Sequence, residues 1–155
     1  MSILRLYQRL AGKPGGRWLF SCLVCLKAPY FASIAPRIQA LEPGRGEATL
    51  RHRRRVTNHI GSVHAIALCN LAEFIGGLTT EVSLPASMRW IPKGMVVEYL
   101  KKAMGPMRAI ATPTFAPQPA EAGYELPLDV AITDSAGEAV FRARITMWIS
   151  PRPPH

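Results

Sequence analysis

Residues 1–42 carry their hydrophobic positions at helical spacing, interrupted by Pro and Gly. Apolar residues three and four positions apart predict one helix over residues 2–12 and a second over residues 17–27. A third, short helix is predicted over residues 31–41, ending at the turn sequence EPGRG (42–46). We therefore expect the chain to begin with a helical segment.

Between Glu47 and Thr57 hydrophobic and polar residues alternate instead, which predicts a β-strand. Arg51, Arg53 and Arg55 fall on one face of this strand. These arginines could hold a phosphate group, or they could form the solvated face of an edge strand. The alternation leaves both interpretations open.

A long helix is predicted over about residues 63–78, after a polar loop. Ser62 is a suitable N-cap, and apolar residues surround the predicted helix almost completely, so we expect it to be buried. Glu73 is the exception, a carboxylate in this apolar run with no Lys or Arg within four residues. Burying an unpaired charge is costly, so Glu73 needs either an arginine partner from the sheet or a function.

Four segments with strand-like alternation follow the helix, at residues 95–103, 107–115, 124–133 and 138–149. The sequence DSAG (134–137) predicts a hairpin turn between the last two. This order predicts an α+β fold in which about five antiparallel strands wrap around one long helix. We expect an N-terminal helical extension over residues 1–44, a sheet-and-helix domain over 45–150 and a tail at 151–155.

The length of 155 residues suits one domain, but its charge is unevenly distributed. The net charge is +9, and residues 1–60 hold eleven of the 19 basic residues and two of the ten acidic ones. A basic segment favours an anionic partner: nucleic acid, an acidic membrane surface or a phosphate-bearing small molecule. Nucleic acid is disfavoured, because the Arg-rich segment has no interleaved aromatic residues and no recognition-helix motif follows it.

The longest apolar run, WLFSCLVCL at residues 18–26, is less than half as long as a transmembrane helix, so no membrane span is expected. The three cysteines cannot form an even-numbered disulfide framework, which favours a reducing cytoplasm. Cys22 and Cys25 have CxxC spacing. We interpret them as core thiols on a helix, because the chain has no second cysteine pair.

Motifs of several enzyme classes are absent from the sequence. It contains no GxSxG nucleophile motif, no HExxH or paired-cysteine zinc motif, no GxxxxGK[ST] phosphate loop and no GxGxxG dinucleotide motif. Cys69 lies in apolar surroundings that do not activate a thiol. We therefore expect neither a metal nor a cofactor.

The remaining candidate chemistry lies in the segment NHIGSVHAIALCNLAEF (58–74). The start of its helix presents backbone N–H groups that can hold a carbonyl oxygen as it gains negative charge. Glu73 can serve as a base or a nucleophile. His64 and Glu73 are nine residues apart, about 14 Å along a helix, so one chain cannot bring both to one ligand. The chemistry therefore needs a second copy of the chain.

Asn58, His64 and Glu73, together with the predicted order of strand, helix and four strands, resemble the hotdog-fold acyl-CoA thioesterases of the phenylacetate-pathway type. That family has an Asn six residues before a His-Gly-Gly and an acidic residue nine after the His, and the positions of all three residues, Asn58, His64 and Glu73, match here. The resemblance spans about residues 45–150. The long N-terminal extension resembles a domain-of-unknown-function branch of the same superfamily. Ala65 and Ile66 occupy the positions of the paired glycines.

The resemblance implies a homo-oligomer, a dimer or a dimer of dimers, that hydrolyses an acyl-CoA thioester. The thioester carbonyl is expected to accept a hydrogen bond from the N–H of Ala65 or Ile66, next to His64. Glu73 of the partner subunit is expected to activate water or to attack the carbonyl, with Asn58 orienting the water or the carboxylate. The CoA phosphates are expected over Arg51, Arg53 or Arg55.

Two alternatives stay open. The side chains at Ala65 and Ile66 are compatible with a non-hydrolytic acyl-CoA or lipid-binding protein of the same fold. The basic residues 1–60 are compatible with a protein that binds a membrane surface or nucleic acid.

Overall fold

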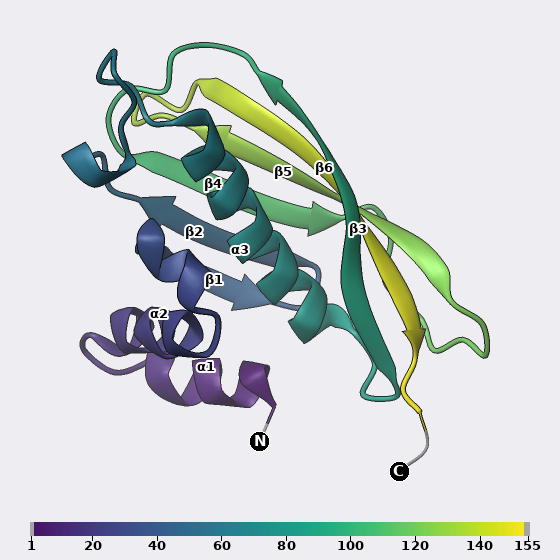
Figure 1. Ribbon diagram of the computed structural model, residues 1–155. Helices are drawn as coiled ribbons and strands as arrows, with labels where there is room; N and C mark the ends of the chain where they lie inside the picture. The colour runs from purple at the N-terminus through teal and green to yellow at the C-terminus, as the bar shows by residue number, and fades with distance from the viewer. Residues whose placement is uncertain (1, 154–155) are drawn as a thin grey trace.

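The computed structural model describes residues 2–153 of the chain. Two α-helices and a 3-10 helix come first, a long α-helix lies in the middle, and strands precede and follow it (Figure 1). In order the elements are α1 (Ile3–Ala11), α2 (Gly16–Lys27), η1 (Pro29–Ser33), β1 (Arg37–Glu42), β2 (Arg45–Leu50), η2 (Arg54–Val56), α3 (Ala65–Ser83), β3 (Met88–Tyr99), β4 (Met107–Pro113), β5 (Tyr124–Thr133) and β6 (Ala139–Pro151).

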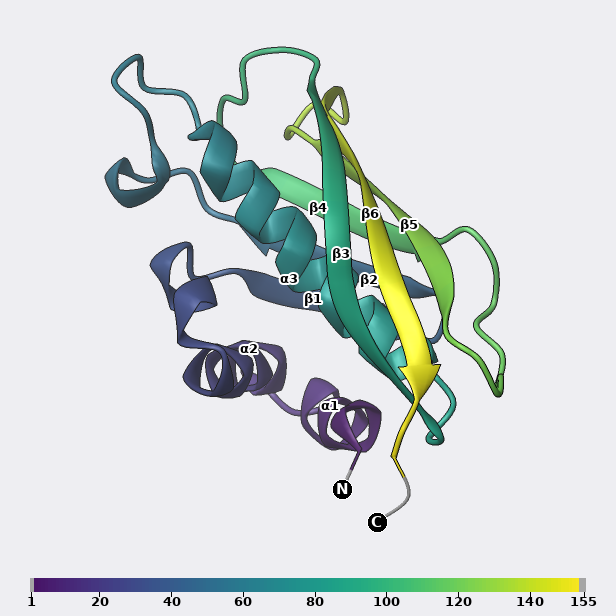
Figure 2. The same cartoon turned by 45° about the vertical axis from the view of Figure 1, so that its right-hand side comes forward.

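The strands form one six-stranded antiparallel sheet in the order β1-β2-β4-β5-β6-β3, curved around α3 (Figures 1 and 2). Alternate side chains of β4, β5 and β6 are buried against the helix. A Cβ atom at Gly76 would lie 3.0 Å from side-chain carbons of Ile145 and Leu128, so glycine allows α3 to approach the sheet closely. This is the hotdog arrangement, and the expected α+β fold is confirmed.

The prediction of a helix over residues 31–41 is wrong. Only η1 is helical there, and residues 37–42 form β1, which pairs with β2 through a turn at Gly44. Proline disfavours the α-helical conformation of the residue before it, and Ala35, before Pro36, has a positive φ of 44°. The sheet therefore has one strand more than the five expected, and the domain boundary expected at residue 44 falls within the β1–β2 turn.

The prediction of a strand from Glu47 to Thr57 is correct only as far as Leu50, where β2 ends. Leu50 pairs with Met107, the first residue of β4, so the ladder ends there. The chain then turns through η2. Because the strand stops, Arg51, Arg53 and Arg55 do not share a strand face as the alternation predicted.

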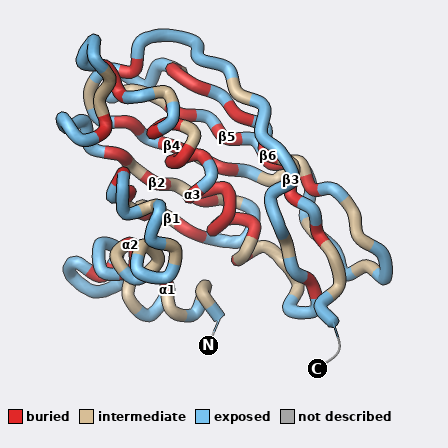
Figure 3. The backbone as a smooth tube through the Cα atoms, viewed as in Figure 1, coloured by how far each residue is buried: buried red, intermediate tan, exposed pale blue. Residues whose placement is uncertain are grey.

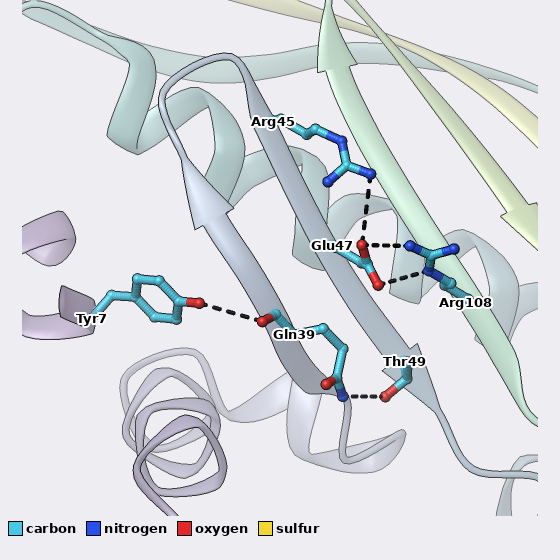
Figure 4. A network of polar contacts seen from close by, with 6 residues as sticks. All are labelled: Tyr7, Gln39, Arg45, Glu47, Thr49 and Arg108. Carbon is cyan, nitrogen blue, oxygen red and sulfur yellow. Dashed lines mark hydrogen bonds and ion pairs between the residues drawn. The ribbon is translucent and has the colours of Figure 1, made fainter. Parts of the chain in front are cut away.

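The N-terminal helices are attached to β1 by specific contacts. Tyr7 of α1 donates a hydrogen bond from its hydroxyl to the carbonyl of Gln39 (3.4 Å), as Figure 4 shows, and packs edge-to-face on Phe20 of α2. The Ser21 hydroxyl donates to the carbonyl of Arg17 and accepts from the N–H of Ile38. Helices α1 and α2 therefore form a fixed layer beside α3 (Figure 2).

Helix α3 begins at Ala65 and ends at Ser83, so it is longer than the expected span of 63–78. It is not buried all round: Ile66 and Glu73 are exposed, and Cys69 between them is half-buried. By length and hydropathy α3 also qualifies as a membrane span, but 72% of that window is buried inside the domain, as in a core helix. The open side of α3 lies toward β3, an edge strand that is exposed along most of its length (Figure 3).

Candidate functional site

The loop before α3 is organised by Asn58. Its carboxamide oxygen accepts hydrogen bonds from the N–H groups of Ile60 and Ser62, and its amide donates to the Ser62 hydroxyl (2.8 Å). Gly61, with a φ of 79°, adopts the left-handed conformation that this turn requires. Asn58 thus fixes the loop that leads into the helix, and Ser62 belongs to this loop instead of capping the helix.

His64 is the N-cap of α3. Its side-chain Nδ1 accepts a hydrogen bond from the backbone N–H of Ile66 (3.1 Å). The backbone N–H of His64 donates to the carbonyl of Val56. The N–H of Ala65, the first helical residue, has no acceptor within residues 2–153. Of the two N–H groups expected to hold a carbonyl oxygen, one is therefore engaged by His64 and one is open.

Glu73 lies on the open side of α3 and is exposed, so the burial expected for it is wrong. Its position at a helical turn that the strands of the sheet do not cover explains the exposure. No hydrogen bond or ion pair reaches its carboxylate from any residue that the structure describes. The arginine partner considered as its alternative explanation is thus absent from the same residues, and the carboxylate is available to a ligand.

The two halves of the candidate site are separated within one chain. Ala65 starts α3, while Glu73 lies more than two turns further along it. At 1.5 Å per residue the separation along the axis is about 12 Å, too far for both groups to touch one carbonyl. One chain presents a free N–H at one place and a free carboxylate at another.

A pocket of about 560 Å³ lies beside Glu73, between α3 and the N-terminal helices. Its walls are mostly apolar and come from α1, α2, η1, α3 and the start of β3. Trp90 and Glu81 belong to its lining and are joined by a hydrogen bond from the indole N–H to the carboxylate (2.7 Å). Sequence reasoning missed this pocket, because segments far apart in the chain build it and no local pattern marks them.

Cys69 lies one helical turn before Glu73 and contacts the hydroxyl of Tyr99 on β3 (3.3 Å). This hydrogen bond, with a smaller effect of burial, raises the pKa of Tyr99 to about 12. Tyr99 is therefore a neutral phenol at physiological pH. It extends the open surface of α3 toward the edge strand.

The arginines named from the sequence separate into two positions. Arg51 and Arg53 line a second pocket, of about 450 Å³, with Arg37, Trp18 and Leu26. Arg53 also donates to the carbonyl of Ile34 (3.0 Å). Arg55 is exposed on η2, outside that pocket. The pocket contains three guanidinium groups and suits an anionic ligand.

Cys22 and Cys25 are half-buried and line this second pocket. Burial, with the neighbouring Cys22, raises the pKa of the Cys25 thiol. Across residues 2–153 no three His, Cys, Asp or Glu side chains come close enough to hold a metal ion.

The fold is shared with solved structures at several levels of similarity. A structural-genomics protein, APC5556, is 44% identical, covers 97% of this chain and 99% of its own, and superposes with a TM-score of 0.82. PA5026 from Pseudomonas aeruginosa, described as a protein of unknown function and probable thioesterase, is 26% identical over 84% of this chain and 92% of its own, with a TM-score of 0.73. Thioesterase HI1161 from Haemophilus influenzae is 20% identical over 81% and 85%, with a TM-score of 0.70, and at this identity the match shows the fold alone.

The comparison with curated proteins gave no match. A family model, Domain of unknown function (DUF4442), matches residues 16–149, which include α2, η1 and every strand up to Ile149 of β6. The match confirms the resemblance to a domain-of-unknown-function branch, and the solved structures confirm the resemblance to hotdog-fold thioesterases. The chain belongs to the DUF4442 family and has the hotdog fold.

Proposed function

We propose that the protein is a homo-oligomeric acyl-CoA thioesterase. The observation that carries the proposal is the carboxylate of Glu73, which is exposed on the helix at the centre of a hotdog fold and has no partner within the described chain. A free carboxylate on a mostly apolar surface is suited to activate water or to attack an electrophilic carbonyl.

The proposed site combines Glu73 of one subunit with the start of α3 in another. The open N–H of Ala65 donates to the thioester oxygen and stabilises the negative charge that develops there. His64 holds the first turn of the helix and Asn58 holds the loop before it, so both act as positioning residues. A two-subunit site follows from the separation of Ala65 and Glu73 within one chain.

The hydrolysis requires one base and one oxyanion donor. Glu73 takes a proton from water, the hydroxide adds to the carbonyl carbon, and the oxygen becomes an oxyanion at the N–H of Ala65. When the oxyanion collapses, the C–S bond breaks and the proton held by Glu73 passes to the thiolate. The products are a carboxylic acid and the free thiol of CoA. In the alternative covalent route Glu73 attacks the carbonyl itself and the C–S bond breaks, so that CoA leaves as the thiolate and an acyl–Glu73 anhydride forms. Water then hydrolyses this anhydride to the carboxylic acid and the Glu73 carboxylate, and the proton that is released passes to the thiolate.

The basic surface supplies the counter-charges for CoA. Arg51 and Arg53, which line one pocket, and Arg55 nearby in sequence are the proposed phosphate contacts. The exposed strand β3 is the proposed oligomer edge, since a long edge strand that exposes aliphatic side chains, here Ile91 (62%) and Val96 (74%), can pair with a second copy. The three free cysteines support a reducing cytoplasmic location.

The test measures thiol release from a series of acyl-CoA esters by wild type and by Glu73→Gln. Because Glu73 is exposed and unpaired, the variant is expected to keep its stability. Because it lacks the catalytic base, its kcat is expected to fall about 10²- to 10⁴-fold. Glu121→Gln, an exposed loop carboxylate, is the matched control and is expected to keep full activity. Hydrolysis by Glu73→Gln at the wild-type rate would overturn the assignment.

A second candidate function is non-hydrolytic binding of an acyl-CoA or lipid. The occupied N–H of Ile66 and the 56% exposure of its side chain favour this candidate, since they restrict the approach of a thioester to the helix start. It predicts calorimetric binding of CoA esters by wild type without thiol release.

A further inference from the structure

The 560 Å³ pocket beside Glu73 has the size of a small-molecule site. Its two sides come from different parts of the chain. Leu6 of α1 and Leu23 of α2 lie on one side, and Phe74 and Leu78 of α3 lie on the other. Most of the wall is hydrocarbon, so the surface suits an apolar chain.

The wall on the α3 side is held in place by two contacts. Phe31 of η1 packs edge-to-face on Phe74, with ring centroids 5.3 Å apart. Trp90 is fixed by its hydrogen bond to Glu81 and lies against Gly77, where a Cβ atom would come within 2.8 Å of the indole ring. The absence of a side chain at Gly77 therefore lets the Trp90 ring lie directly against α3, where it forms part of the pocket lining.

The wall on the other side is held independently of any ligand. Tyr7 and Ser21 attach α1 and α2 to β1 through hydrogen bonds to Gln39 and from Ile38. The pocket is thus a preformed feature of the N-terminal layer. Preformed walls reduce the ordering cost of binding.

Glu73 indicates how a ligand is oriented in the pocket. It is an exposed carboxylate in an otherwise mainly apolar lining, whereas the other carboxylate, Glu81, is engaged by Trp90. We propose that this pocket receives the acyl group of the thioester, and that α1 and α2 thereby set the longest chain accepted. The inference rests on the proposed function, because the reacting carbonyl lies at Glu73 and the acyl chain runs from there between the helices.

The expected selectivity follows from burial of methylene groups. Transfer of one CH₂ group from water to a fully apolar site corresponds to about a fourfold gain in affinity, and a partly open pocket gives less. We expect the dissociation constant to fall about two- to fourfold per added methylene until the chain reaches the end of the pocket, and then to level off.

The experiment measures binding without turnover. Thioether analogues of CoA carrying linear alkyl chains of increasing length, which cannot be hydrolysed, are titrated into the full-length protein by calorimetry. Leu23→Trp fills the pocket from α2 and Leu6→Trp fills it from α1. The matched control is Leu19→Trp, also on α2 and similarly exposed (42% against 37% for Leu23), but outside the lining.

The pocket-filling variants are expected to weaken binding of the longest analogues at least tenfold and to leave the shortest unchanged, while Leu19→Trp follows wild type. Thermal unfolding confirms that each variant is folded. Affinity independent of chain length in wild type, or a chain-length profile unchanged in both filling variants, would overturn the inference. Failure of the proposed function is recognised separately, in the thiol-release assay. In that case Glu73→Gln hydrolyses acyl-CoA esters at the wild-type rate, or wild type releases no thiol, whatever the dependence of binding on chain length.

Discussion

His64 and Ile66 are joined by a hydrogen bond in which the backbone N–H of Ile66 donates to Nδ1 of His64 (3.1 Å). The histidine therefore acts on the helix that carries it, as its N-cap, and leaves the N–H of Ala65 open. His64, which the resemblance to the thioesterases placed among the catalytic residues, therefore has a structural role, because it accepts a hydrogen bond from the residue two positions further along the chain.

Replacement of His64 tests this capping role. His64→Ala removes the acceptor and is expected to lower the free energy of unfolding by about 1 kcal/mol, whereas His64→Asn supplies another acceptor and restores most of it. Urea denaturation measures both. Equal stability of the alanine and asparagine variants would contradict a capping role.

The open N–H of Ala65 can be removed without disturbing the helix. Ala65 is the first residue of α3, where proline is well tolerated, and His64 before it has φ −62° and ψ 137°, a conformation that proline permits in its predecessor. We expect Ala65→Pro to fold normally and to lose about 10²- to 10³-fold in kcat, because the oxyanion loses its donor.

Mixing two inactive variants tests whether the site is shared between subunits. In a dimer of Ala65→Pro with Glu73→Gln, one site carries both defects and the other carries neither. Refolding the two variants together at equal amounts is expected to restore about a quarter of wild-type activity, because half of the dimers are mixed and each has one intact site. A site contained in one chain would recover nothing on mixing.

The exposed edge strand β3 predicts the oligomer interface. Val96 on this strand is 74% exposed although it is aliphatic. Val96→Lys places a charge on the edge and is expected to shift the protein to monomers in analytical ultracentrifugation and to abolish hydrolysis, since each site then lacks its second half. Tyr30→Lys, at an aromatic residue 71% exposed on η1, is the control and is expected to stay oligomeric.

The ion pair between β2 and β4 predicts a dependence of stability on pH. Arg108 donates two hydrogen bonds to Glu47 (2.6 and 2.8 Å; Figure 4), and this lowers the pKa of Glu47. A carboxyl whose pKa is lowered by folding stabilises the protein fully above its unfolded pKa, and the contribution is lost as the pH falls through the folded value.

We therefore expect Glu47→Gln to be less stable than wild type at neutral pH. The difference should shrink below about pH 4 to 5, as the wild-type carboxyl takes up its proton. Thermal unfolding across this range measures the difference. Glu121→Gln is expected to follow wild type throughout, and a difference between Glu47→Gln and wild type that persists at the lowest pH would contradict the ion-pair explanation.

Local patterns predicted the elements that depend mainly on local physics. The apolar spacing around Leu71 and Ile75 identified α3, and the alternation in residues 138–149 together with DSAG identified the hairpin of β5 and β6. The error at residues 31–41 has a different origin. Their composition tolerates a helix, but pairing of β1 with β2 stabilises a strand, and this pairing is not visible in the segment itself.

The residues of the candidate site were partly predictable for the same reason. The position of Glu73 in an apolar run and the polar loop at Asn58 are visible in the sequence, and the nine residues between His64 and Glu73 led to the prediction of a site shared by two copies of the chain. The exposure of Glu73 was not predictable. It depends on which side of α3 the sheet covers.

The sequence by itself thus determined the central helix, most of the strands, the fold class and the carboxylate that stands out chemically, because periodicity and charge are local properties of the chain. Only the tertiary structure decided that His64 caps the helix, that Glu73 is open, and that α1, α2 and Trp90 enclose a pocket beside it. The exposure of Glu73 and the pocket depend on the packing of segments as distant as Leu6 and Trp90, which line the same pocket, and such packing forms only when burial of the whole core brings the segments together.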